Sequence, residues 1–243
     1  MNDLKKRNSV EFEVYGKYAL FSDPVTRVGG EKMSYQVPTY QAIKGILESV
    51  YWKPTIIWYI DKIRVMNKIV TQAKGIRPIK MSRGNDLSYY TYLSDVRYQV
   101  LAHFEFNENR PQLAHDRNEN KHHQMAKRKI ETGGRRDIFL GTRECQGYVV
   151  PCKFGRGDGF YDNYGELSFG TMFHGFNYPD ETGEEKLETR FWQPKMIDGV
   201  IEFIPPTACS IVKFIRKQKA KEFIDNRNFS SLTDDNLKVG DLG

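Results

Sequence analysis

One run of alternating residues constrains the fold of this chain more than any other feature. Six apolar side chains occupy every second position between residues 96 and 106, namely Val96, Tyr98, Val100, Ala102, Phe104 and Phe106. Most of the intervening residues are polar, and successive side chains of a β-strand point to opposite faces of a sheet. The run therefore predicts a strand with one buried face, which must pack against a second layer.

Weaker patterns predict the elements around this strand. Apolar residues alternate with polar ones from Val10 to Val14, and an apolar stripe at spacings of three and four runs from Ile43 to Tyr51. Residues 67–94 follow no period. The predicted order is a strand at 10–16, a helix at 38–51, strands at 55–60 and 96–106, a helix at 119–131 and a strand within 138–150.

This order is that of ferredoxin-like and RRM domains. We therefore predict an α+β fold, in which one antiparallel four-stranded sheet is backed by two helices. Residues 7–154 would form this domain, residues 155–225 a small, mostly-β C-terminal domain, and the polar residues 226–243 a disordered tail. Such sheets often bind RNA, but a fold alone assigns no function.

The composition agrees with a cytoplasmic protein that has a polyanionic partner. The chain has 243 residues, a net charge of +6, a pI near 9.0 and a mean hydropathy of -0.62. No apolar run is long enough to span a membrane, and the first residues do not resemble a signal peptide. The three cysteines, an odd number with no evident pairing, favour a reducing compartment.

The strongest indication of function is a basic stretch at residues 116–143. Between residues 121 and 136 it has six Lys or Arg side chains and one acidic residue, Glu131. Cationic side chains and a flexible glycine turn suit the binding of phosphates, although ordinary surface charge explains the same pattern. The residues that we predict to bind RNA are Arg128, Lys129, Gly133, Gly134, Arg135, Arg136 and Arg143.

Lys121 and His122 have the side-chain types that cut RNA without a metal ion. A base takes the proton of a ribose 2′-OH, which attacks the adjacent phosphate, and a cation stabilises the charge that develops. Histidine suits the proton transfer and lysine the charge. Tyr51, at the end of the first predicted helix, could orient the 2′-OH, although a core aromatic is the simpler explanation for its position.

A metal-dependent nuclease is the competing interpretation. His115 and Asp116 lie close in sequence to His122 and His123, so that these residues could form a cluster. However, the sequence has no HExxH motif and no pair of CxxC motifs. We therefore expect neither a metal site nor a cofactor.

Four segments together resemble one protein family. They are GGEKMSYQVPTYQAIKGILESVYWKPT (29–55), AHDRNENKHH (114–123), GGRRDIFLGTRECQGYV (133–149) and HGFNYPDE (174–181). The similarity, which spans about residues 7–215, is to the Cas-five family of CRISPR-associated proteins in the variant of the type I-C (Dvulg) system. It implies a RAMP-type ferredoxin-like domain, in agreement with the strand order.

The resemblance also implies an activity and partners. Members of this variant cut the CRISPR repeat RNA at the 3′ base of its hairpin, without a metal ion, and then stay in a Cascade complex with Cas-seven and Cas-eight subunits. The family's catalytic Tyr, Lys and His fall on Tyr51, Lys121 and His122, and His123 could substitute in part. The alternative is a non-catalytic subunit that binds a crRNA end, and duplex DNA is a further potential ligand of either.

Overall fold

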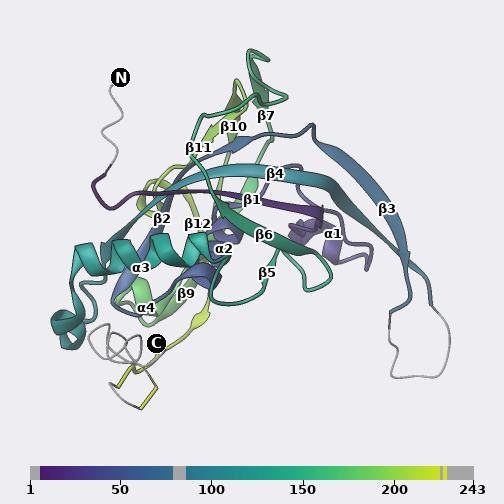
Figure 1. Cartoon of the computed structure of the whole chain (residues 1–243). Helices are drawn as coiled ribbons and strands as arrows, with labels where there is room; N and C mark the ends of the chain where they lie inside the picture. Colours follow the sequence, from purple (N-terminus) through teal and green to yellow (C-terminus); the bar gives the residue numbers. More distant parts are fainter. Residues whose placement is uncertain (1–5, 79–85, 225–226, 229–243) are drawn as a thin grey trace.

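A nine-stranded antiparallel sheet forms the body of the computed structural model, which describes residues 6–78, 86–224 and 227–228 (Figure 1). Its strands run in the order β5-β6-β1-β4-β2-β11-β10-β7, and β3 pairs with β4 beside this path. The strands are β1 (Val10–Ala19), β2 (Ile56–Val65), β3 (Val70–Ile76), β4 (Ser88–Phe106), β5 (Ile138–Phe139), β6 (Gln146–Pro151), β7 (Glu166–Ser168), β10 (Lys195–Ile197) and β11 (Val200–Glu202).

The central strands β6-β1-β4-β2 have the ferredoxin-like order, and every pair among them is antiparallel. Helices α2 (Tyr40–Val50) and α3 (Glu119–Glu131) pack on this part of the sheet. The predicted fold class is therefore confirmed. The alternating run at 96–106 is the second half of β4, the strand between β1 and β2, and its apolar face is buried in the core.

Helix α2 begins where Thr39 caps it, since the Thr39 side chain accepts a hydrogen bond from the backbone N–H of Ala42. Its apolar stripe, with Ile43 and Leu47 fully buried, faces the core. The helix ends at Tyr51, whose backbone is extended but whose N–H still donates to the carbonyl of Leu47. This end places the Tyr51 side chain against α3.

Helix α3 is capped by Asn118, whose side chain accepts from the backbone N–H of Lys121. Its buried face consists of His122, Ala126 and Ile130, which are spaced four residues apart. The cationic side chains lie on the remaining surface of the helix, so that α3 has one core face and one basic face.

The segment without a period holds a long hairpin formed by β3 and the first half of β4 (Figure 1). Tyr89 on this hairpin is about half exposed, whereas Tyr92 is buried. Part of the segment, residues 79–85 with Gly84, lies outside the described residues. The strand predicted within 138–150 is two short strands, because Gly141 turns the chain at φ +96° with its α-carbon against the carbonyl of Leu20.

The C-terminal part contributes strands to both sheets of the protein. β7, β10 and β11 extend the main sheet beyond β2, while β8 (Met172–Asn177), β9 (Lys186–Trp192) and β12 (Ile211–Lys217) form a separate three-stranded sheet. The predicted domain division at residue 155 stays a prediction, although strands from both sides of it share one sheet. The tail predicted from residue 226 lies, except for residues 227 and 228, outside the described residues.

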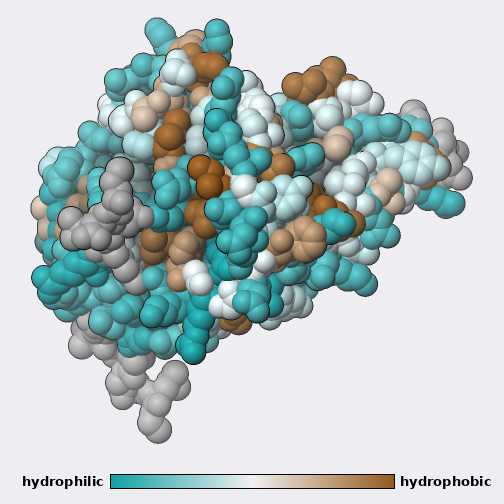
Figure 2. Space-filling view, turned by 90° about the horizontal axis from the view of Figure 1, so that it is seen from above, coloured by the Kyte–Doolittle hydropathy of each residue, from teal (hydrophilic) through white to brown (hydrophobic). Residues whose placement is uncertain are grey.

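The remaining helical segments are short, and the surface in the view of Figure 2 has both apolar and polar side chains. They are α1 (Pro24–Arg27), α4 (Pro179–Thr182) and the 3-10 turns η1 (Pro111–Asp116) and η2 (Pro206–Ala208). Seen from above, apolar side chains form separate groups between polar ones (Figure 2). No helix in the described part of the chain is both long and apolar enough to cross a bilayer.

Candidate active site

Tyr51 and His122, which are 71 positions apart in the sequence, are in direct contact. The hydroxyl oxygen of Tyr51 lies 2.8 Å from Nδ1 of His122. The C-terminal end of α2 supplies the tyrosine and the first turn of α3 supplies the histidine. The structure thus brings together two of the three residues predicted to be catalytic.

The second ring nitrogen of His122 identifies which partner donates. Nε2 lies 2.8 Å from the backbone carbonyl oxygen of Asp116, which can only accept, so Nε2 carries a proton. In the neutral ring Nδ1 is then an acceptor, and the hydroxyl of Tyr51 donates to it. Burial lowers the pKa of His122, against the opposing effect of Asp116, and this favours the neutral ring.

Asp116 and Thr55 contact the His122 side of this pair, and the sequence did not predict these contacts. The Thr55 hydroxyl donates to the Asp116 carboxylate at 2.6 Å, and that carboxylate lies 3.7 Å from Nε2 of His122. From the sequence, Asp116 was expected only as a candidate metal ligand. A negative charge at this distance would stabilise His122 if it took up a proton.

Aromatic rings enclose the histidine. The rings of Phe104 and Phe106 lie edge-on to His122, with centroids 6.0 Å and 6.2 Å away, and Trp58 donates its indole N–H to the carbonyl of Tyr51 at 2.8 Å. As a result His122 is 0% exposed and Tyr51 only 3%. His122 therefore has no surface on which an RNA could contact it directly in this structure.

Lys121 lies outside this network, although it is the neighbour of His122. Adjacent residues of a helix point about 100° apart, and the Lys121 side chain is exposed while His122 is buried. His123 is half-buried, and its Nε2 lies 3.0 Å from the carbonyl oxygen of Ser9. The structure therefore keeps the cation and the proton acceptor on different faces of α3.

The glycine pair forms the turn between α3 and β5, and this turn is hydrogen-bonded to the end of α2. Gly133 and Gly134 have φ of +79° and +110°, and Gly134 donates its N–H to the carbonyl of Lys129 at 2.7 Å. The N–H of Arg135 then donates to the carbonyl of Val50 at 3.2 Å. These bonds give the glycines a structural role and place the basic turn one residue away from Tyr51.

The other residues predicted to bind RNA lie on the last turn of α3 (Arg128 and Lys129), directly after the glycines (Arg135 and Arg136) and in the loop between β5 and β6 (Arg143). Arg128, Arg135, Arg136 and Arg143 are exposed, and Lys129 is half-buried. Nearby, a groove of about 460 Å³ follows the outer face of α2. Arg27 and Lys32 line this groove with the small residues Gly45 and Ser49, and neither cation was predicted as a ligand.

The residues proposed for the competing metal site are not arranged as ligands. His115 is exposed, while the Asp116 carboxylate accepts from Thr55 and both nitrogens of His122 are hydrogen-bonded. Across residues 6–78, 86–224 and 227–228, no three His, Cys, Asp or Glu side chains converge on a point that could hold a metal ion.

Comparisons with known proteins agree on one family. The model of the family described as CRISPR-associated protein (Cas_Cas5) matches residues 9–204. A protein of Mannheimia succiniciproducens named CRISPR pre-crRNA endoribonuclease Cas5d is 31% identical, over 85% of this chain and 99% of the relative. A protein of the same name from Thermus thermophilus is 28% identical, over 73% of this chain and 77% of the relative.

Two solved structures share the fold. One, described as a CRISPR-associated protein, has a TM-score of 0.72 and 36% identity, and a functionally uncharacterized protein of Streptococcus mutans has a TM-score of 0.71 and 39% identity. In each comparison the match covers 84% of this chain and 96% of the other. From the family match and the identity to the Mannheimia protein, we conclude that the chain belongs to the Cas5 (Cas-five) family of CRISPR-associated proteins.

Proposed function

We propose that this chain is the endoribonuclease that processes precursor crRNA in a type I-C CRISPR system, and that it acts without a metal ion. Both Cas5d relatives are named as pre-crRNA endoribonucleases. The observation that carries the proposal is the hydrogen bond from Tyr51 to the neutral His122. It joins two of the residues on which the family's catalytic residues fall, and it forms a path for a proton.

In the proposed reaction Tyr51 contacts the RNA and His122 acts through it. The ribose 2′-OH gives its proton to the Tyr51 oxygen while the Tyr51 proton moves to Nδ1 of His122. The 2′-oxygen forms a bond to phosphorus, the bond to the 5′-oxygen breaks, and that oxygen takes a proton from Lys121 or water. The products are a 2′,3′-cyclic phosphate and a 5′-hydroxyl. Because Tyr51 is almost fully buried, the side chains around it must move when RNA binds.

Lys121 and the basic turn would hold the phosphates. The exposed ammonium of Lys121 stabilises the extra charge of the phosphorane, and Arg135 and Arg136 fix the RNA beside Tyr51. We further propose that the product stays bound while the protein joins Cas-seven and Cas-eight subunits in a cytoplasmic Cascade complex. The same basic surface would also attract duplex DNA.

The second candidate is a non-catalytic subunit that only binds the crRNA end. The full burial of His122 favours it, because a histidine with both nitrogens satisfied in the core also has a purely structural explanation. The two candidates differ in whether purified protein cuts its repeat RNA.

The test is incubation of the purified chain with its repeat RNA in EDTA, followed by mapping of the new ends. We expect cleavage to persist and to leave a 2′,3′-cyclic phosphate. A 2′-deoxy nucleotide just upstream of the cut should block cleavage but leave binding nearly unchanged, because it removes only the attacking group. Cleavage of the deoxy substrate would exclude attack by the 2′-OH, and no cleavage of any substrate would favour the binding subunit.

A further inference from the structure

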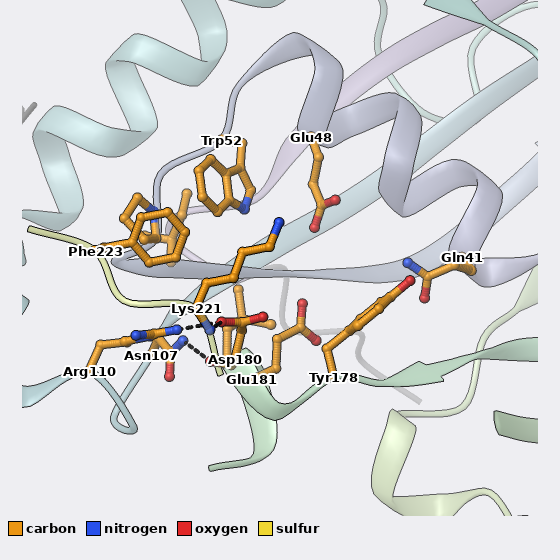
Figure 3. Close-up of a pocket in the computed structure, with 13 residues that line it drawn as sticks. Gln41, Glu48, Trp52, Asn107, Arg110, Tyr178, Asp180, Glu181, Lys221 and Phe223 are labelled. Atoms are coloured by element: carbon orange, nitrogen blue, oxygen red, sulfur yellow. Dashed lines mark hydrogen bonds and ion pairs between the residues drawn. The ribbon is translucent and has the colours of Figure 1, made fainter. Parts of the chain in front are cut away.

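A partly open pocket of about 200 Å³ begins one residue beyond Tyr51 (Figure 3). Its walls come from α2, the start of β2, the loop after β4, α4 and the segment 221–223. Trp52, Ile56 and Ile57 provide its apolar lining. This volume is below the several hundred Å³ that drug-sized ligands occupy, and it suits a single aromatic ring system.

One carboxylate in the pocket, that of Glu48, accepts no hydrogen bond from the residues that the structure describes. The Asp180 carboxylate pairs with Arg110 at 2.5 Å, and the Glu181 carboxylate pairs with Lys44 at 2.5 Å. Glu48, in contrast, points into the space between Trp52 and Tyr178 (Figure 3), and no hydrogen bond to it is found among the described residues. Burial raises the pKa of Glu48 to about 7, although the nearby Lys44 acts in the opposite direction.

Such a group is costly unless a ligand satisfies it. At a pKa of about 7 the Glu48 carboxyl is partly ionised at neutral pH, and hydrogen-bond donors from a ligand would favour the ionised form. That form accepts hydrogen bonds and donates none, so a ligand that binds it must offer donors. Two adjacent donors in one plane would engage both carboxylate oxygens at once. The Glu48 carboxylate therefore favours a ligand with two adjacent hydrogen-bond donors, and the apolar walls favour a flat ring.

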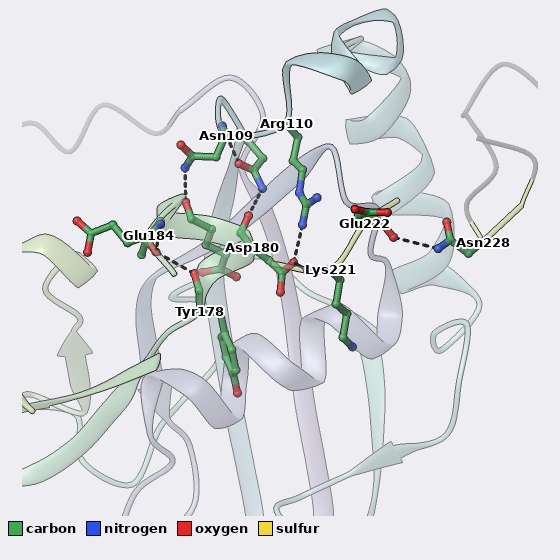
Figure 4. A network of polar contacts seen from close by, with 11 residues as sticks. Asn109, Arg110, Tyr178, Asp180, Glu184, Lys221, Glu222 and Asn228 are labelled. Carbon is green, nitrogen blue, oxygen red and sulfur yellow. Dashed lines mark hydrogen bonds and ion pairs between the residues drawn. The ribbon is translucent and has the colours of Figure 1, made fainter. Parts of the chain in front are cut away.

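The segment 221–223 lines one side of the pocket and is held there by contacts with neighbouring elements (Figures 3 and 4). The Lys221 backbone N–H donates to Asp180 at 2.7 Å, and Phe223 packs on Trp52 with a centroid distance of 5.5 Å. The guanidinium of Arg110 lies 5.1 Å over the Phe223 ring. In Figure 3 the ammonium of Lys221 points toward the same space as Glu48.

We propose that this pocket binds one unstacked guanine of the RNA, with the ring against Trp52 and its N1–H and N2–H groups donated to Glu48. The inference rests on the proposed function, since the RNA is what brings the base. On its Watson–Crick edge guanine alone offers two adjacent donors, whereas adenine and cytosine place an acceptor beside a donor, which a carboxylate repels. Lys221 meets the phosphate of the same nucleotide.

A guanine held here would position the cut. Trp52 follows Tyr51 directly in the chain, so a base fixed against Trp52 sets which ribose reaches the Tyr51 hydroxyl. Holding the reacting groups in register in this way is a large part of what an active site contributes. The base would thus be a specificity determinant of cleavage rather than a catalytic group.

The experiment uses the full chain and a set of its repeat RNAs in which each guanine is replaced, one at a time, by inosine, which lacks the N2 amine. At one position we expect inosine to weaken binding roughly tenfold, the effect of one charge-assisted hydrogen bond. Glu48→Gln should weaken binding of the unmodified RNA by a similar factor. It should also make that inosine substitution silent, because the two changes remove the same contact.

Glu185→Gln is the matched control, because it makes the same chemical change at an exposed position outside the pocket. Trp52→Ala tests the proposal independently of Glu48, including if Glu48→Gln does not fold. Loss of stacking should weaken binding about tenfold and silence the same inosine position. Binding that is insensitive to inosine at every guanine, or that stays sensitive in both variants, would overturn the pocket assignment.

Cleavage of the same RNAs separates this inference from the proposed function. If the chain cuts its repeat and no guanine is sensitive to inosine, the endoribonuclease stands and the pocket assignment fails. If one guanine shows the expected pattern of binding and no RNA is cut, the pocket stands and the endoribonuclease fails.

Discussion

The two faces of α3 differ in burial and in charge. On the inner face His122 has both ring nitrogens hydrogen-bonded and no exposed surface, and it is followed by the buried Ala126 and Ile130. On the outer face Lys121 and Arg128 are exposed to solvent. The interactions of the inner face are short-range contacts within the protein. The exposed charges of the outer face act over a longer range and attract any polyanion.

This difference separates stability from affinity along one helix. A change on the inner face leaves buried polar groups without partners, and that destabilises the folded state. A change on the outer face removes a solvated charge, which has little effect on folding and a larger one on RNA binding. Catalysis in the proposed reaction requires both faces, because Lys121 and His122 act on one transition state.

The largest effect is expected for His122→Ala. It removes the acceptor of the Tyr51 hydroxyl and the donor to the Asp116 carbonyl, and it leaves a cavity between Phe104 and Phe106. Together these losses should lower the free energy of unfolding by about 3 kcal/mol, measured by urea denaturation. Lys121→Ala should change it by less than about 0.5 kcal/mol. Equal stability of the two variants would mean that the inner face does not organise the helix end.

The next effect concerns the rate of cleavage rather than stability. Tyr51→Phe deletes only the hydroxyl, and Lys121→Ala only a solvated cation, so both variants should fold. Each should slow single-turnover cleavage by roughly a hundredfold, since general acid–base and charge-stabilising steps contribute about that much. RNA affinity should fall by about 1 kcal/mol or less. Full rates in both variants would leave only the binding-subunit candidate.

The sequence predicts the fold well because the fold depends on local periodicity. The run from 96 to 106 could be assigned as a strand, since its alternation is set by the two faces of β4 itself. The hairpin of β3 was missed, because its packing partner is the first half of β4 and its residues are largely exposed. An exposed strand does not alternate between apolar and polar residues, so the sequence pattern does not indicate it.

The candidate site was only partly predictable for a related reason. His122, Ala126 and Ile130 are spaced as one buried helix face, but the surrounding lysines and arginines made the stretch read as a basic surface. The hydrogen bonds to Tyr51 and Asp116 join distant segments and leave no signal in a single sequence. The catalytic roles of Tyr51, Lys121 and His122 stay predictions.

Acid should destabilise the fold through two buried histidines, His122 on the inner face of α3 and His174 on β8, and should leave the outer face of α3 unaffected. Burial lowers the pKa of His122, and it lowers the pKa of His174 to about 4, with Arg190 contributing. The unfolded chain, with histidine near 6.5, then binds more protons than the folded one, so stability is full above pH 6.5 and is lost as the pH falls toward 4. From pH 7.5 to pH 5 we expect a loss of about 2 kcal/mol from His174.

Thermal or urea unfolding at several pH values measures this loss. His174→Gln provides the control, because an amide can still donate to the carbonyl of Ile204, which His174 meets at 3.0 Å, but does not titrate. Its stability should therefore fall less between pH 7.5 and pH 5 than that of the wild type. An identical fall in both proteins would assign the acid sensitivity to other groups.

The smallest effect is expected on the outer side, where Arg135 and Arg136 lie exposed on the turn after α3. Replacing both with Ala should weaken binding of repeat RNA by about 1 kcal/mol at moderate salt. It should leave the free energy of unfolding nearly unchanged. The slope of log affinity against log salt should become shallower by up to about 1.5, as expected for two lost phosphate contacts. Lys213→Ala with Arg216→Ala removes the same charge from the exposed strand β12 and serves as the control. Because net charge is equal in the two double variants, a shallower slope in the first alone would place the RNA backbone at the turn beside Tyr51. Equal slopes would show instead that only the total charge of the protein matters, and the basic turn after α3 would then lose its assigned role.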